Sequence, residues 1–180
     1  MPEKKDAHGR AAPRASRPTM PDYGVLDAQS GQGLLPWSWA TERLASARNY
    51  WIATARPDGS PHMTPVWGVW FDDTFYFSTG RRSRKARNLA ADPRCVVCPE
   101  GADEPVILEG TAERVTDPEM LGQVAAAISA KYQWTMVPTP DGMRDEHGNE
   151  GPVFAVRPHT AFGFGQDLSG SATRWSFGAE

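Results

Sequence analysis

The sequence has few residues of the kinds that build a self-contained catalytic or metal centre. Of its 180 residues, two are cysteine and four are histidine. No group of histidine, aspartate and glutamate has the spacing of metal ligands. The Gly-x-Ser-x-Gly motif, the P-loop and the dinucleotide fingerprint are also absent. We therefore expect no metal site, and we expect any chemistry to depend on a bound cofactor.

Long hydrophobic runs and a strong net charge are lacking as well. No apolar run approaches the roughly 18 residues that a membrane span needs, and the N-terminal segment lacks the continuous apolar core of a secretory signal. The formal net charge is only −3, which argues against nucleic acid as a partner. We therefore expect a cytoplasmic protein that binds neither membrane nor nucleic acid and acts on a small molecule.

The two cysteines, Cys95 and Cys98, form a Cys-x-x-Cys pattern. Such a pattern is typical of a redox pair or of half a zinc site. Residues three apart on a strand point to opposite faces, however, and the sequence has no second cysteine pair to complete a zinc site. We therefore interpret both cysteines as small apolar residues of a strand.

Hydrophobic patterning predicts a mainly β domain with flanking helices. Residues 1–33 are rich in Pro, Ala, Gly, Arg and Ser, which predicts a disordered tail before a folded domain over residues 34–180. Within the domain we expect helices at 38–49, 83–91 and 116–132, strands at 50–55, 61–71, 74–78, 95–99, 106–115, 153–156, 160–164 and 173–177, and a polar loop at 133–151. This order of elements indicates a small β-barrel with helices packed outside it.

A cluster of positive charge follows the Thr79-Gly80 turn and coincides with a predicted helix start. Its basic residues are Arg81, Arg82, Arg84, Lys85, Arg87 and Arg94, against a single acid, Asp92. Cations are unfavourable at a helix N-terminus, where the macrodipole is already positive, unless an anion binds there. We therefore interpret residues 78–88 as a phosphate-binding corner rather than as a solvated helix face. No aromatic platform for nucleic acid is interleaved with these charges.

The run from Gly59 to Arg94 resembles the split β-barrel flavin/deazaflavin family, which is typified by pyridoxamine 5′-phosphate oxidase and includes actinobacterial deazaflavin-dependent reductases. The resemblance rests on the Ser-Arg-Lys-x-x-x-Leu helix start at 83–89 and the Thr-Arg-Trp-x-Phe ending at 173–177. It implies a six- to seven-stranded split β-barrel of the FMN-binding type. It also implies a homodimer with cofactor sites at the subunit interface.

The resemblance further implies which residues hold the cofactor. The strand around residue 65 would lie along the tricyclic ring through backbone contacts, the helix start would hold the phosphate, and the C-terminal pair would arrive from near or across the interface. The implied cofactor-binding residues are Met63, Thr64, Pro65, Val66, Trp67, Ser78, Thr79, Arg81, Ser83, Arg84, Lys85, Asn88, Arg174 and Trp175. No catalytic side chain is assigned, although His62 and His159 are candidates for acid–base chemistry.

Coenzyme F420 is the implied cofactor, with FMN as the alternative. We expect an F420-dependent oxidoreductase that transfers a hydride from reduced deazaflavin to a small conjugated or aromatic acceptor, in a pocket closed by residues 133–151. The alternatives are an FMN-dependent enzyme like pyridoxamine 5′-phosphate oxidase and a non-catalytic flavin- or haem-binding module. The chain has no match to the oxidase's pyridoxal-phosphate-binding residues near the C-terminus, which argues against the vitamin B6 oxidase reaction.

Overall fold

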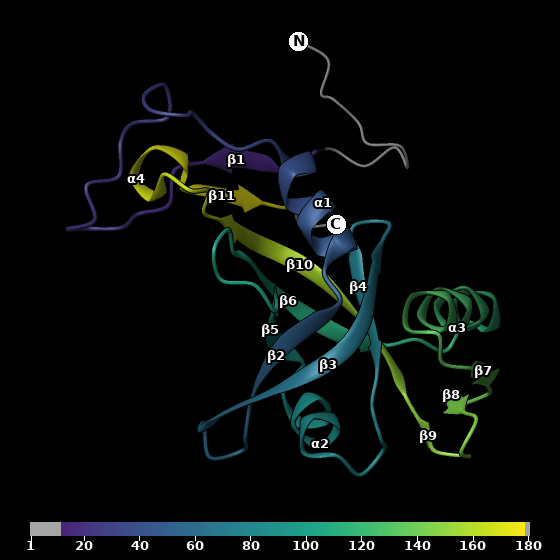
Figure 1. The fold of residues 1–180 in the computed structure, drawn as a ribbon. Coiled ribbons are helices and arrows are strands. Elements are labelled where there is room, and N and C mark those ends of the chain that lie inside the picture. Colours follow the sequence, from purple (N-terminus) through teal and green to yellow (C-terminus); the bar gives the residue numbers. More distant parts are fainter. Residues whose placement is uncertain (1–11, 179–180) are drawn as a thin grey trace.

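A closed barrel of six antiparallel strands forms the centre of the protein (Figure 1). The structure, a computed structural model, describes residues 12–178. The barrel strands are β2 (Asn49–Ala55), β3 (Pro61–Phe71), β4 (Thr74–Ser78), β5 (Arg94–Pro99), β6 (Val106–Arg114) and β10 (Val153–Gly163). They follow the order β10-β4-β3-β2-β5-β6, and a second pairing of β6 with β10 closes the barrel. The split β-barrel predicted from the sequence is confirmed.

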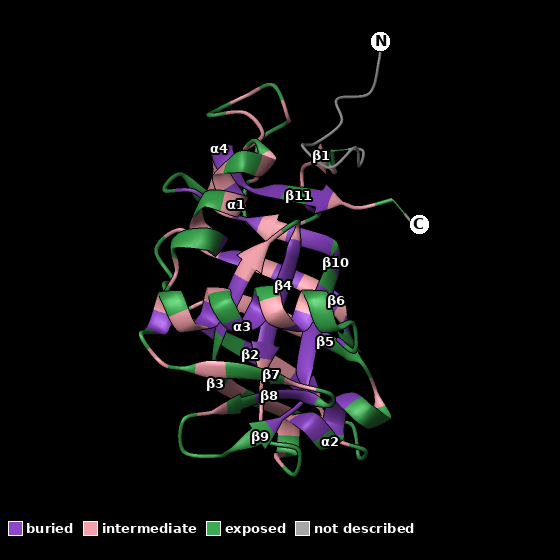
Figure 2. Cartoon of the chain, turned by 90° about the vertical axis from the view of Figure 1, so that its right-hand side faces the viewer, coloured by how far each residue is buried: buried purple, intermediate pink, exposed green. Residues whose placement is uncertain are grey.

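The described residues also form four helices and further strands outside the barrel. These are α1 (Trp37–Ser46), α2 (Arg84–Ala91), α3 (Pro118–Tyr132), α4 (Leu168–Ser171), β1 (Arg14–Ser16) and β11 (Thr173–Ser176), with β7 (Met136–Thr139), β8 (Gly142–Asp145) and β9 (Glu150–Gly151) in a separate three-stranded sheet. In two perpendicular views α2 lies at one end of the barrel, whereas β1, β11 and α4 lie at the other (Figures 1 and 2). Among residues 12–178, no helix has the length and apolarity needed to cross a membrane.

The β3–β4 hairpin explains why the barrel, although closed where these two strands pair, is split further along β3. Its turn residues, Asp72 and Asp73, have φ values of 51° and 50°, as a two-residue type I′ turn requires. β3 pairs with β4 only from Gly68 to Phe71. Its earlier residues, 61–67, pair with β2 but with no strand on the β4 side among the described residues. The barrel therefore opens along this edge of β3, where the described residues provide no neighbouring strand and another partner could pair with the backbone.

Two hydrophobic clusters hold the fold together. One fills the barrel and includes Tyr50, Phe75 and Leu108, and the other lies between α3 and the outside of the barrel (Figure 2). In β5, Cys95 is buried and Cys98 is half-buried, and both are free thiols. The interpretation of these cysteines as ordinary strand residues agrees with this placement.

Three boundaries differ from those expected from the sequence. The segment 133–151, predicted as a loop, contains β7, β8 and β9, none longer than four residues and thus too short to show a periodic pattern. β10 is continuous where two strands were predicted, because Pro158 lies at a register shift, where its missing N–H interrupts no regular ladder. α1 begins at Trp37, with Pro36 rather than Ser38 as its N-cap.

Residues 12–33 also differ from the prediction of a disordered tail, while residues 1–11 lie outside the described part of the chain. β1 pairs with β11 in antiparallel register, with Arg14 opposite Ser176. The Arg17 guanidinium donates hydrogen bonds to four backbone carbonyl oxygens, those of Asp27, Ser30, Gly170 and Ala172. The segment is therefore held by backbone pairing and one arginine, and neither produces a hydrophobic periodicity in the sequence.

Candidate cofactor site

The N-terminus of α2 presents two backbone donors that no group among the described residues satisfies. Ser83 is the N-cap, and its hydroxyl accepts a hydrogen bond from the amide of Ala86 at 3.2 Å. The amides of Arg84 and Lys85 have no hydrogen-bond partner within residues 12–178. Free amides and the helix dipole together favour an anion at this position, and the phosphate corner itself stays a prediction.

Positive side chains add to this preference. Lys85 is half-buried, and burial lowers its pKa. The pKa of His62 is lowered as well, first by burial and then by the positive charges of Arg56, Lys85 and Arg84. An anion bound among these groups would raise the pKa values of Lys85 and His62 again, because an opposite charge favours the protonated forms.

Two polar atoms at the same corner are buried without a hydrogen-bond partner among the described residues, His62 Nδ1 and Asn88 Oδ1. Asn88 is 1% exposed, and its Nδ2 donates to Thr54 Oγ1 at 2.9 Å. Thr54 lies opposite His62 in the β2–β3 register, so β2, β3 and α2 meet here. Unpartnered buried polar atoms are rare in folded proteins, and their presence here fits a corner that a polar ligand completes.

The free edge of β3 runs from this corner along the residues predicted to lie beside the ring. The side chains of Met63, Pro65 and Trp67 point outward, and those of Met63 and Trp67 are 56% and 44% exposed. The side chain of Val66 is buried in the barrel, and Thr64 is half-buried. A planar ligand in this position would therefore contact the backbone of Val66, and it would contact the residues beside Val66 partly through their side chains.

The segment between β4 and α2 is already tied to its surroundings. Ser78 Oγ donates to the Pro152 carbonyl oxygen at 3.2 Å, and the hydroxyls of Thr79 and Ser83 lie 3.0 Å apart. These contacts fix the path of the chain into α2. They leave the helix N-terminus itself as the main source of free donors.

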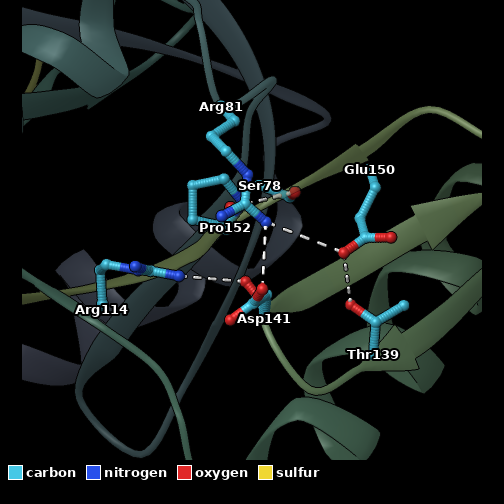
Figure 3. Close-up of polar contacts among 7 residues, drawn as sticks. All are labelled: Ser78, Arg81, Arg114, Thr139, Asp141, Glu150 and Pro152. Atoms are coloured by element: carbon cyan, nitrogen blue, oxygen red, sulfur yellow. Dashed lines mark hydrogen bonds and ion pairs between the residues drawn. The ribbon is translucent and has the colours of Figure 1, made fainter.

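Arg81, at the start of the segment leading into α2, faces two acidic side chains. Its guanidinium lies 3.5 Å from a carboxylate oxygen of Asp141 and 3.8 Å from one of Glu150 (Figure 3). Both acids belong to the β7–β9 region, which sequence patterning missed, so these partners are not expected from the sequence. Arg81 thus links the start of α2 to the small sheet, and its role in holding the phosphate stays a prediction.

The C-terminal pair lies far from this corner within one chain. β11 is at the opposite end of the barrel from α2 (Figure 1). Trp175 has no exposed surface, and its ring packs on those of Trp37 and Trp39 with centroids 5.3 and 6.5 Å away. Arg174 is exposed on the same strand. Trp175 is therefore a core residue, contrary to the prediction that it lines the cofactor site.

Sequence reasoning omitted Thr54 and Arg56 from the site and considered His62 only as an acid–base group. The hairpin register could have identified them. Pairing Ala55 with Pro61 across the predicted turn places Thr54 opposite His62, at the end of the hairpin that lies near α2.

Comparisons with known proteins agree with this description. A family model described as pyridoxamine 5′-phosphate oxidase matches residues 40–159. A search of curated proteins gives no match. Among solved structures, one described as an F420 reductase is similar with a TM-score of 0.51 and 22% identity, over 67% of this chain and 93% of the other.

Two further solved structures share the fold. A conserved hypothetical protein from Mycobacterium tuberculosis has a TM-score of 0.61 and 24% identity, over 83% of this chain and 92% of its own. A FAD-binding protein from Mesorhizobium loti has a TM-score of 0.56 and 16% identity, over 80% of this chain and 96% of its own. The family match covers most of the barrel and the whole of α2. The chain therefore belongs to the pyridoxamine 5′-phosphate oxidase family, a group of split-barrel oxidoreductases that use flavin-type cofactors.

Proposed function

We propose that this protein is an F420-dependent oxidoreductase that reduces a small conjugated or aromatic acceptor. The observation that carries the proposal is the excess of positive charge around the start of α2. Lys85 and the two free amides suffice for one phosphate. Arg82 and Arg84 are exposed beside them, with no ion-pair partner among the described residues. This surplus suits the long polyanionic tail of the deazaflavin better than the single phosphate of FMN.

The residues present fit a cofactor of this type. The free amides and Lys85 would hold the phosphate, and His62 Nδ1 and Asn88 Oδ1 are buried polar atoms that ligand oxygens and hydroxyls would satisfy. The free edge of β3 would orient the planar ring through its backbone. The cofactor supplies the hydride chemistry when bound, and the chain supplies position and charge. No side-chain acid is required where solvent provides the proton.

We further propose that a second copy of the chain covers the outer face of β2 and β3. Trp51 and Pro65 are direct neighbours in the strand register, and the large hydrophobic side chains of Trp51, Met63 and Trp67 are exposed. A contiguous apolar face of this kind is typical of an interaction surface. Because it adjoins the free edge of β3, a homodimer formed through it would enclose the cofactor groove between subunits.

The proposal is tested by hydride transfer with purified protein. Reduced coenzyme F420 is mixed with conjugated enones, quinones and nitroaromatic compounds, and its oxidation is followed by absorbance. A parallel series uses reduced FMN under the same conditions. Turnover with the deazaflavin and at least one acceptor supports the proposal. Turnover with FMN alone, or binding of either cofactor without turnover on any acceptor, contradicts it.

A further inference from the structure

A cavity of about 290 Å³ lies where β3 and β4 diverge, between the barrel, α3 and the β7–β9 sheet. Trp67, Ser78 and Thr79 line it from the barrel side, and they also border the free edge of β3 and the segment leading to α2. The cavity is therefore continuous in sequence and structure with the cofactor groove, but it is built largely from other elements.

The walls of the cavity are aromatic and apolar. Trp67 stacks on Tyr132 with ring centroids 4.5 Å apart and an interplanar angle of 9°, which fixes its orientation. The rings of Trp134 and Trp67 are in edge-to-face contact, with centroids 6.1 Å apart and an interplanar angle of 74°. Met136 and Met143 complete the apolar surface. Two rigid indoles at a steep angle provide one face for stacking and one edge for lateral contact, an arrangement that suits a flat aromatic ring.

The charge of the cavity is opposite to that of the phosphate corner. Asp145 and Glu150 line it, and no lysine or arginine is among its lining residues. The carboxylate of Asp145 accepts hydrogen bonds from Asn149 and from the His147 amide, and these hydrogen bonds lower its pKa, so it stays ionised at neutral pH. Glu150 accepts from Thr139 at 3.2 Å and is only loosely paired with Arg81. Both carboxylates therefore retain capacity to receive a donor.

We propose that this cavity is the acceptor site of the reaction, and that it selects flat aromatic compounds bearing a positive charge or a hydrogen-bond donor while rejecting anions. The role of the cavity as an acceptor site rests on the proposed function, whereas the selectivity of the cavity for ligands does not. The volume is near the lower end of the range for small-molecule sites, ~300–1,000 Å³, which restricts the ligand to two or three fused rings. The opposite charges of the two regions would also prevent an anionic cofactor tail from entering the acceptor cavity.

The selectivity is tested on cofactor-free protein with two three-ring probes of similar shape. One is 9-aminoacridine, which is cationic at neutral pH, and the other is the anion 9-anthracenecarboxylate. Calorimetric titration at fixed salt should show one site per chain that binds the cation at least about tenfold more tightly than the anion. Glu150→Gln should reduce this preference about three- to tenfold. The control Glu146→Gln, a neighbouring acid that does not line the cavity, should leave it unchanged.

The location is tested by Trp134→Ala, which should weaken acridine binding at least about tenfold, and by Trp134→Phe, which keeps a ring and should restore most of it. Val137→Ala is the matched control, because Val137 is 46% exposed and outside the cavity lining. Equal binding of the two probes, tighter anion binding, or unaltered acridine affinity in Trp134→Ala overturns the proposal.

A separate titration distinguishes a failure of the acceptor-site proposal from a failure of the proposed function. Trp134→Ala should bind coenzyme F420 with an affinity within about twofold of the unaltered protein. An equal loss of F420 and acridine affinity would place the cofactor ring in the cavity and overturn the acceptor assignment, while the proposed cofactor stands. If neither F420 nor FMN binds but the acridine preference is found, the proposed function fails and the selectivity of the cavity is supported.

Discussion

Replacing Lys85 by alanine removes the side chain that we expect to contribute most to phosphate binding. Lys85 is in the first turn of α2 beside two free amides, is half-buried, and has a pKa lowered by burial alone. A hydrogen bond to a charged group contributes roughly 1.5–3 kcal/mol, which corresponds to about a 10- to 150-fold change in affinity. Because partial burial weakens solvent screening, we expect the loss to fall in the upper half of this range.

The assay is a fluorescence titration of coenzyme F420 into the wild type and two variants, with circular dichroism melts of each. Lys85→Ala should lose affinity and keep its melting temperature, since the lysine ammonium has no hydrogen-bond or ion-pair partner within residues 12–178. Arg87 is two residues further along α2 and is exposed, so its side chain points away from Lys85. Arg87→Ala should therefore bind nearly as the wild type does. Equal losses in both variants would mean that the helix acts as a diffuse positive field, which would refute the reasoning.

Three further predictions concern stability and assembly. Burial lowers the pKa of Lys131 to about 8, so between pH about 8 and 10 the unfolded chain holds a proton that the folded chain lacks. As the pH rises through this range, the free energy of unfolding of the wild type should therefore increase relative to that of Lys131→Met. Parallel pH dependences of the two proteins in urea melts would contradict this. A chain starting at Leu34 loses β1 and the carbonyl contacts of Arg17, and should be less stable by at least about 2 kcal/mol; an unchanged thermal melt would show that the segment contributes nothing. Trp51→Glu should convert the proposed dimer to a monomer in light scattering, whereas Val137→Glu, on another surface, should not; a wild-type mass matching one chain would refute the dimer.

The parts of the fold that the sequence predicts well are governed by local rules. The hairpin of β3 and β4 has alternating faces and a two-residue turn that tolerates positive φ. The start of α2 carries a serine N-cap followed by concentrated positive charge. Each of these signals lies within a few residues of the structure it specifies, so the hairpin and the start of α2 are both predictable.

The errors involve contacts between residues distant in sequence. β1 pairs with β11, about 160 residues away, and no local pattern in a three-residue strand reveals that partner. The resemblance implies a cofactor role for Trp175, yet the packing of Trp37 and Trp39 buries its side chain completely. The ion pairs of Arg81 are equally hard to foresee, because its acidic partners belong to a sheet whose strands are too short to predict.

The central claim is that the site is built for the deazaflavin cofactor. The most direct measurement is a pair of titrations, coenzyme F420 and FMN, on the same cofactor-free protein at low and high salt. We predict that coenzyme F420 binds at least about tenfold more tightly than FMN at low salt, and that the difference shrinks at high salt because the exposed arginines are screened. FMN binding that equals or exceeds F420 binding at low salt, or an F420 affinity that salt does not change, would show that the site is not built for the deazaflavin.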